Sequence, residues 1–157
     1  MTVMKPAAAV VIAAAGPEDV PAIGALLDAA DLPAEDFAGH LAHFLVARAE
    51  GAVVGAAGFE RHGPAALLRS LVVAPGRRGA GLGGELVRRL AVQARREGVE
   101  QFYLLTTTAE EFFARRGFRK IARAAVPAAI AATAEFHRLC PASAACLTRA
   151  AAEPAGP

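Results

Sequence analysis

Near the middle of the chain the sequence reads Leu71-Val-Val-Ala-Pro-Gly-Arg-Arg-Gly-Ala-Gly-Leu-Gly-Gly84. Its first residues are apolar, as in a strand, and the residues from Leu82 onward have the spacing of an amphipathic helix. The glycines between them let the backbone turn sharply and approach a ligand closely, because they carry no Cβ. A helix that begins there points unpaired N–H groups and the positive end of its dipole at the turn. The stretch therefore predicts a phosphate-binding turn, to which Arg77 and Arg78 add charge.

The spacing of the glycines distinguishes three kinds of phosphate site. A P-loop needs a lysine followed by serine or threonine, and neither is present in this stretch. Gly79, Gly81 and Gly84 have the bare Gly-x-Gly-x-x-Gly spacing of a dinucleotide site, but the turn follows a meander of strands and does not open a βαβ unit. The pattern Val-x-Pro-x-x-Arg-x-x-Gly-x-Gly, from Val73 to Gly83, closely resembles the acyl-CoA pyrophosphate loop of the GNAT superfamily of N-acetyltransferases.

The rest of the chain predicts a single domain over residues 1–157, a length that buries about two thirds of the unfolded surface. Turns at Glu50-Gly51 and at His62-Gly63-Pro64 indicate an antiparallel meander. The ends, 1–8 and 152–157, are expected to be flexible. Hydrophobic periodicity predicts strands at 9–14, 44–48, 53–60, 65–73, 101–105, 118–123 and 142–148, and helices at 17–30, 33–42, 82–98, 109–116 and 127–137.

This order of elements is similar to that of the GNAT superfamily over nearly the whole chain. The resemblance implies an α/β fold with a mixed, mostly antiparallel twisted sheet of six to seven strands, flanked by helices and splayed between the fourth and fifth strands. It also implies that acetyl-CoA is the co-substrate, with pantetheine along the fourth strand and pyrophosphate on the turn. The residues implied in the donor site are Leu71, Val72, Val73, Arg77, Arg78, Gly79, Gly81, Leu82, Gly83 and Gly84.

A second stretch, Thr106-Thr-Thr-Ala-Glu-Glu-Phe-Phe-Ala-Arg-Arg-Gly-Phe118, resembles the family signature that follows the fifth strand. Many members carry a tyrosine five residues before the final phenylalanine, and its hydroxyl can protonate the leaving thiolate. This chain has Phe113 there, which cannot donate a proton. The stretch is similar instead to the N-acetylglutamate-synthase branch, which acetylates the α-amine of an acidic amino acid.

The general base is not given by the family pattern. Many members place a glutamate early in the fourth strand, where this chain has Leu67-Leu68. We predict that Glu60, at the end of the third strand, accepts the proton from the ammonium group, although an exposed strand-end glutamate would fit the sequence equally well. His62 and His137 are interpreted as structural or solvated.

Arg69 interrupts an otherwise apolar strand, where a charge is costly unless it is paired or lies in a wet cleft. Two interpretations stay open. The guanidinium can hold a substrate carboxylate through a bidentate contact, or it can form an ion pair with Glu60 on the adjacent strand.

The run from Glu135 to Thr148, which contains Leu139-Cys-Pro-Ala-Ser143, resembles the arsenic-resistance N-acetyltransferase group. In the glutamate-acetylating relatives the comparable loop helps to bind the acceptor, so Ser143 is predicted to donate a hydrogen bond to a substrate carboxylate. A serine in this position is also ordinary turn chemistry. Cys140 and Cys146 are interpreted as free packing thiols, and joint binding of trivalent arsenic is the alternative.

Composition limits the other functions. A net charge of +2 is too small to indicate nucleic acid, and the apolar segment from Ala7 to Ala15 is too short to cross a bilayer. We therefore expect a cytoplasmic protein that acts on a small amine, without nucleic acid or membrane partners. The two cysteines have no zinc-site spacing, so no metal is expected, and a homodimer is left open.

Together these observations predict an acetyl-CoA-dependent N-acetyltransferase that acts by direct transfer. The predicted acceptor is an amino acid or an amino-acid-like toxic compound of the arsenic-resistance type. Three alternatives remain: a CoA-binding regulatory domain that has lost catalysis, an arsenic-binding protein that uses Cys140 and Cys146, and an acetyltransferase with a protein or ribosomal acceptor.

Overall fold

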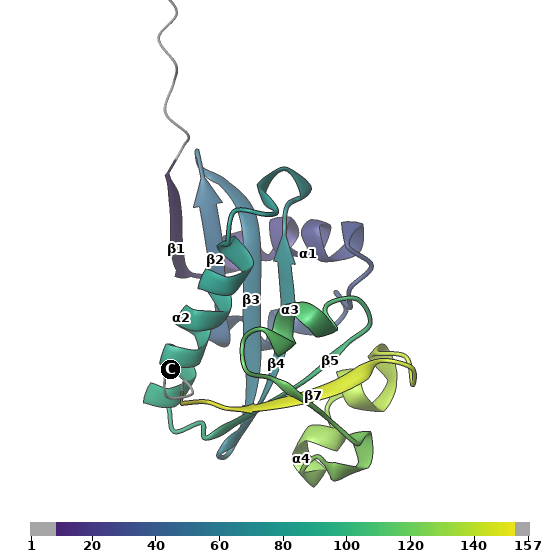
Figure 1. The fold of residues 1–157 in the computed structure, drawn as a ribbon. Helices are drawn as coiled ribbons and strands as arrows, with labels where there is room; N and C mark the ends of the chain where they lie inside the picture. Colours follow the sequence, from purple (N-terminus) through teal and green to yellow (C-terminus); the bar gives the residue numbers. More distant parts are fainter. Residues whose placement is uncertain (1–8, 153–157) are drawn as a thin grey trace, which may run out of the picture.

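The computed structural model describes residues 9–152, and these form one seven-stranded sheet in the order β1-β2-β3-β4-β5-β7-β6 (Figure 1). Neighbouring strands are antiparallel except for the parallel pair β4 and β5. This confirms the predicted mixed, mostly antiparallel sheet. The strands are β1 (Val10–Ala14), β2 (Phe44–Ala49), β3 (Ala52–His62), β4 (Ala65–Val73), β5 (Gln101–Thr106), β6 (Arg119–Ile121) and β7 (Ala145–Ala150).

Helices lie on both faces of the sheet, with α1 and α2 on opposite sides (Figure 1). The α-helices are α1 (Val20–Ala29), α2 (Leu82–Arg96), α3 (Glu110–Ala114) and α4 (Ala128–Ala131). Short 3-10 segments are η1 (Pro17–Asp19), η2 (Phe37–His43), η3 (Pro75–Arg77) and η4 (Arg123–Ala125), and one π-helical turn, η5, spans Glu135–Leu139. No helix in the part of the chain from 9 to 152 is long and apolar enough to cross a membrane.

The core follows the alternation of side chains along the strands. In β2, Leu45 and Ala47 pack with the buried face of α2, whereas Phe44 and Val46 pack with α1. Gly58 in β3 lies directly under the Phe44 ring, where a Cβ would overlap the ring atoms. A third, smaller cluster joins α4 and η5 to β4 and β7. Both faces of the sheet are therefore covered, and the site must open at an end or along a gap between strands.

Two predicted helices differ from the structure. The predicted helix at 33–42 begins only at Phe37 and is a 3-10 segment, because Asp36 directs its carboxylate at Arg69 instead of capping a helix. The predicted helix at 127–137 is divided into α4 and η5. Thr133 interrupts it, since its hydroxyl donates to the Ile130 carbonyl at 2.7 Å and accepts from the Phe136 N–H at 3.4 Å. Apart from residue 152, the ends expected to be flexible lie outside the described residues.

The gap between β4 and β5 is the feature that positions the site. The two strands pair only from Ala65 to Leu67 in β4 and from Gln101 to Tyr103 in β5. Beyond Leu67 they separate, as predicted. β4 also carries a bulge, because Gly58 pairs with Arg69 while Ala56 pairs with Val72. Ser70 sits in this bulge with φ 58°, a left-handed conformation that is unusual for a serine inside a strand.

Candidate active site

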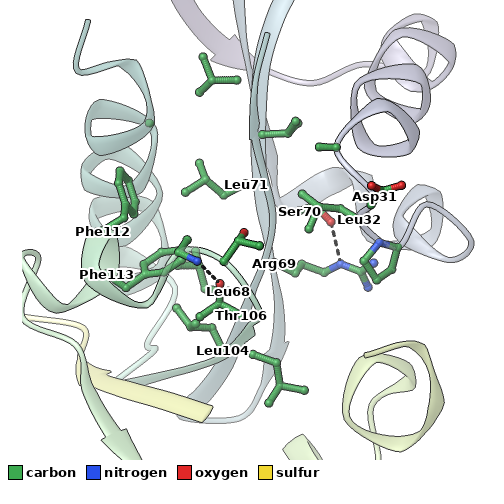
Figure 2. Close-up of a pocket in the computed structure, with 18 of the residues that line it drawn as sticks. Asp31, Leu32, Leu68, Arg69, Ser70, Leu71, Leu104, Thr106, Phe112 and Phe113 are labelled. Atoms are coloured by element: carbon green, nitrogen blue, oxygen red, sulfur yellow. Dashed lines mark hydrogen bonds between the residues drawn. The ribbon is translucent and has the colours of Figure 1, made fainter. Parts of the chain in front are cut away.

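A cavity of about 1030 Å³ fills the space where β4 and β5 separate. It is lined on one side by the end of α1 and the residues after it, and on the other by α2, α3 and the loop after β5. Figure 2 shows both sides, with Asp31 and Leu32 across β4 from Phe112 and Phe113. The cavity therefore connects the two faces of the sheet through the gap.

The bulge in β4 determines which side chains face each half of the cavity. Consecutive residues of a regular strand point to opposite faces. Here Arg69 and Ser70 both point to the α1 side, and the Arg69 Nε donates to the Ser70 Oγ at 3.1 Å, whereas Leu71 points toward Phe112 (Figure 2). The half on the α2 and α3 side will be called the donor side, and the half on the α1 side the acceptor side.

The donor side ends at the glycine-rich turn. Gly79 and Gly81 adopt φ 85° and 82°, and α2 begins directly after Gly81. Of the predicted donor-site residues, the cavity is lined by Leu71, Val72, Val73, Arg78 and Gly83. Arg77, Gly79, Gly81, Leu82 and Gly84 continue from there through the turn into the first residues of α2. The turn thus provides the left-handed glycines and the helix start that a bound phosphate needs.

Two arginines add positive charge to this end of the cavity. Arg78 donates from Nε to the Val73 carbonyl at 3.1 Å. Arg116, which the sequence did not single out, also lines the cavity and lies with its guanidinium 3.6 Å from the centre of the Phe112 ring. A Cβ on Gly84 would come within 2.6 Å of Arg116 Nη2, so the arginine rests on the first turn of α2. Burial lowers the pKa of Arg116, and Arg115 lowers it further.

Phe113 is buried and lines the cavity, where it meets Phe112 and Phe118 edge to face. The position therefore contributes a wall but no proton donor. The Thr106 hydroxyl, which also lines the cavity, accepts a hydrogen bond from the Ala109 N–H at 3.0 Å.

The acceptor side contains a buried ionic cluster around Arg69. The Arg69 side chain is fully buried and pairs with Asp36 at 2.6 Å, with Glu60 at 2.6 Å and with Glu135 at 3.2 Å. The ion pair with Glu60 is one of the two interpretations of the sequence. Burial works against the charged guanidinium, but the surrounding carboxylates outweigh it and raise the pKa of Arg69. The hydrogen bond from Arg69 in turn lowers the pKa of Asp36.

Glu135 is the carboxylate of this cluster that lines the cavity, and the sequence did not single it out. It comes from η5, far along the chain from β4, and it is 4% exposed. Burial raises the pKa of Glu135 to about 7; Arg69 opposes this rise, and the charges of Asp36 and Glu60 add to it. The Cys140 thiol lies 3.8 Å from Glu135 Oε1. A carboxyl group with a pKa near neutrality in a cavity can both accept and release a proton.

Three of the other residues selected from the sequence, Glu60, Ser143 and Cys146, lie outside the cavity. Glu60 is 3% exposed, not an exposed strand end, and it reaches the cavity only through Arg69. Ser143 is exposed and does not line the cavity. Cys146 packs in the apolar cluster with Leu67 and Phe136, whereas Cys140 lines the cavity. The structure therefore brings Arg69 to the site directly and Glu60 indirectly.

The family comparison matches residues 40–120 to the acetyltransferase (GNAT) domain. The chain belongs to the GNAT acetyltransferase family. The matched segment begins in η2 and ends in β6, so it includes the bulge, the glycine-rich turn and the donor side of the cavity. Arg69 and Glu60 lie within it, and Glu135 lies beyond it.

One relative of this GNAT chain is an amino-acid acetyltransferase from Pseudomonas fluorescens (strain Pf0-1). The two are 32% identical over 97 residues, which is 60% of this chain and 22% of the relative. The chain therefore spans only about a fifth of the length of that relative.

Solved structures share the fold. N-acetylglutamate synthase from Neisseria gonorrhoeae, in complex with coenzyme A and N-acetyl-glutamate, superposes with a TM-score of 0.79 at 23% identity. The match covers 92% of this chain and 36% of that one. Rv2747 from Mycobacterium tuberculosis, in complex with CoA and NLQ, has a TM-score of 0.75 at 26% identity, with 89% of this chain and 98% of that chain covered. The match to Rv2747 therefore extends over nearly the whole of both chains.

Proposed function

We propose that this chain is an acetyl-CoA-dependent N-acetyltransferase that transfers the acetyl group directly to a small amine, and that residues 1–157 work as one catalytic domain. The observation that carries this proposal is the cavity between β4 and β5, which joins the glycine-rich turn on one side to the Arg69 cluster on the other. With the CoA pyrophosphate held at the turn, the thioester would lie in the gap, and an amine could approach it from the acceptor side.

For the donor, the turn from Arg77 to Gly84 and Arg116 are proposed to hold the pyrophosphate of CoA. The pantetheine arm lies along β4, where the strand has lost β5 as a partner and its backbone groups are free to pair with a ligand. Because a bulge leaves one residue without a partner across the ladder, an N–H of the Ser70–Val72 segment is available to polarise the thioester carbonyl.

For the base, we propose Glu135 in place of Glu60. Glu135 lines the cavity and its pKa is raised to about 7, so at neutral pH much of it is ionised while it remains basic enough to accept a proton from an ammonium group. Glu60 has one oxygen on Arg69 and does not line the cavity. In this account Glu60 helps to hold Arg69, and Arg69 holds Glu135 in position.

For the acceptor, we propose an α-amino acid, or an amino-acid-like toxic compound of the arsenic-resistance type. Glu135 and Arg69 both line the cavity and lie side by side, with Oε2 and Nη2 3.2 Å apart, so a ligand that carries an ammonium group and a carboxylate on one carbon atom could meet both residues at once. The ammonium would face Glu135, and the carboxylate would share Arg69, whose contact with Glu135 is longer than those with Asp36 and Glu60. The amino-acid acetyltransferase relative supports this class of acceptor.

The test is steady-state release of CoA thiol with a panel of acceptors: L-glutamate, other α-amino acids, the matching amines without a carboxylate, and amino-acid-like arsenicals. We expect turnover with at least one α-amino acid and a loss of kcat/KM when its carboxylate is removed. We expect Glu135→Gln to lower kcat by about 10²- to 10⁴-fold, the usual contribution of a general base. The exposed Glu35→Gln is the matched control and should keep wild-type kcat.

The pH profile separates the base from a structural role. In the wild type, kcat/KM should rise with pH through an apparent pKa near 7, since ionised Glu135 is the active form. This step should be absent in Glu135→Gln. CoA binding without turnover on any acceptor would favour the regulatory-domain alternative, and full activity of Glu135→Gln would reject Glu135 as the base.

A further inference from the structure

On the side of Glu60 away from Arg69, two histidines from different elements converge on the same oxygen. His40 comes from η2 and His62 from the end of β3. His40 Nε2 is 3.4 Å from Glu60 Oε1, and His62 Nε2 is 3.5 Å from the same atom. Asp36, four residues before His40, completes a group in which the ligand atoms of Asp36, His40 and Glu60 lie within 4.8 Å of one another.

The two distances from Glu60 Oε1 fit edges of a tetrahedral metal site, whereas His62 lies outside the group of Asp36, His40 and Glu60. Zinc bonds to imidazole nitrogen and carboxylate oxygen are about 2.0–2.2 Å long, which places neighbouring tetrahedral ligands about 3.4 Å apart. The two separations measured from Glu60 Oε1, 3.4 and 3.5 Å, agree with this value. Neither pair satisfies hydrogen-bond geometry, so the histidines approach Glu60 without bonding to it.

The nitrogen of His62 provides an independent observation. Among the residues that the structure describes, His62 Nε2 is the buried side-chain nitrogen or oxygen without a hydrogen-bond partner. Such a group costs free energy unless a ligand meets it. The His62 side chain is 30% exposed and the His40 side chain is 34% exposed, so an ion can reach the site from solvent.

Arg69 orients the two carboxylates, as residues that hold metal ligands in place usually do. It binds Glu60 through Oε2, which leaves Oε1 directed at the histidines. It also contacts both oxygens of Asp36 and so fixes that side chain. Three carboxylates, those of Asp36, Glu60 and Glu135, surround this one guanidinium, and a divalent cation would balance the excess negative charge.

We propose that Asp36, His40 and Glu60 bind one divalent ion of the zinc class, and that the His62 side chain turns toward them to become the fourth ligand. Two imidazoles with two carboxylates favour zinc over magnesium or calcium, which prefer all-oxygen sites. Four protein ligands leave no open position, as in structural zinc sites, and His40, Glu60 and His62 do not line the cavity. The ion would link η2 to β3 and so stabilise the two segments that hold the Arg69 side chain. This revises the expectation from the sequence that no metal is bound.

The test is titration of tag-free, chelator-stripped full-length protein with Zn²⁺, followed by calorimetry and by thermal unfolding. We expect one equivalent to bind and to raise the unfolding temperature. His62→Gln and His40→Gln should each weaken binding at least about tenfold. Because His62 Nε2 makes no hydrogen bond in the metal-free protein, His62→Gln should change the unfolding temperature without zinc much less than with it.

His137→Gln is the matched control, because His137 is exposed on η5 and should not affect binding. Absence of a one-equivalent site would overturn the proposal. So would binding that survives in both His62→Gln and His40→Gln, since this would place an adventitious ion elsewhere. The proposed acetyl transfer, which uses the other side of Arg69, would be unaffected by that result.

Discussion

The donor and acceptor sides of the cavity are built in opposite ways. The donor side consists mainly of backbone, with glycines at φ 85° and 82°, the start of α2 and a strand edge freed by the splay. The acceptor side consists of side chains, with one buried guanidinium held between carboxylates from the residue before η2, from β3 and from η5. Backbone groups can bind the part of a cofactor that does not vary, whatever side chains the strand carries. A buried ionic cluster is specific, but it depends on every partner being present.

This difference predicts that a single change will affect the two sides unequally. On the acceptor side it should disturb the stability of the whole domain, because each ion in the cluster is desolvated. On the donor side it should disturb ligand affinity, with a smaller effect on folding. The following changes test this contrast, in order of decreasing effect.

Arg69→Met should lower the free energy of unfolding by about 3–5 kcal/mol, because it leaves buried carboxylates without their counter-ion. The measurement is urea-induced unfolding followed by circular dichroism. Arg138→Met is the control, since Arg138 pairs with Glu35 at the surface and such pairs contribute about 0–1 kcal/mol. Equal losses for the two variants would contradict the account of the cluster.

Glu135→Gln should change the dependence of stability on pH. Since the pKa of Glu135 is raised to about 7 in the folded protein, the folded state binds more protons than the unfolded state between its ordinary pKa and 7. The protonated carboxyl group of Glu135 therefore stabilises the folded wild type at low pH, and this contribution is lost as pH rises through 7. The free energy of unfolding of the variant, measured relative to that of the wild type, should therefore rise by about 3 kcal/mol between pH 4 and pH 8.

The unfolding experiments on Glu135→Gln should be run with a chelator present, so that no metal ion changes the field at Glu135. A difference between variant and wild type that stays constant with pH would show that Glu135 does not titrate as described.

Gly81→Ala should weaken acetyl-CoA binding by about tenfold, because an alanine at φ 82° costs about 1–2 kcal/mol and distorts the turn. Gly63→Ala is a close match, since Gly63 has φ 64° and a Cβ added at either glycine would meet no other atom within 4 Å. Gly63→Ala should cost similar folding stability without changing the KM for acetyl-CoA. A KM shift of the same size in both variants would mean that the turn is not the donor site.

Cys140→Ser should change kcat by less than about threefold, since a protonated thiol is a poor nucleophile. Burial and the adjacent Glu135 raise the pKa of Cys140 to about 12, so the thiol stays protonated at neutral pH. Cys146→Ser is the comparison, because Cys146 packs in the apolar cluster and does not line the cavity. Loss of activity in Cys140→Ser, together with an acetylated Cys140 in the wild type, would establish a covalent route in place of direct transfer.

The contrast also explains how much could be predicted from the sequence. The donor side follows from one continuous stretch, Leu71 to Gly84, so its strand, turn and helix were all predicted. The acceptor side depends on pairs such as Arg69 with Glu135, which are 66 positions apart by their residue numbers. No local pattern marks Glu135, because burial and not its neighbours in sequence raises its pKa.

Two short spacings in the sequence mark the residues around Glu60. Asp36 and His40 are four residues apart, the spacing that shares one helical face, and Glu60 and His62 are two apart, which places them on the same face of a strand. Each pair alone is common. Only the register of η2 against β3 brings the pairs together, and the sequence does not give that register.

A crystal structure of the protein with acetyl-CoA tests the central claim most directly. The account predicts the pyrophosphate on the turn from Gly79 to Gly84, the pantetheine along β4 in the gap, and the acetyl group at the Ser70 bulge, open toward Glu135. A thioester that lies outside the gap between β4 and β5, or one whose acetyl group is separated from Glu135 by β4, would contradict it.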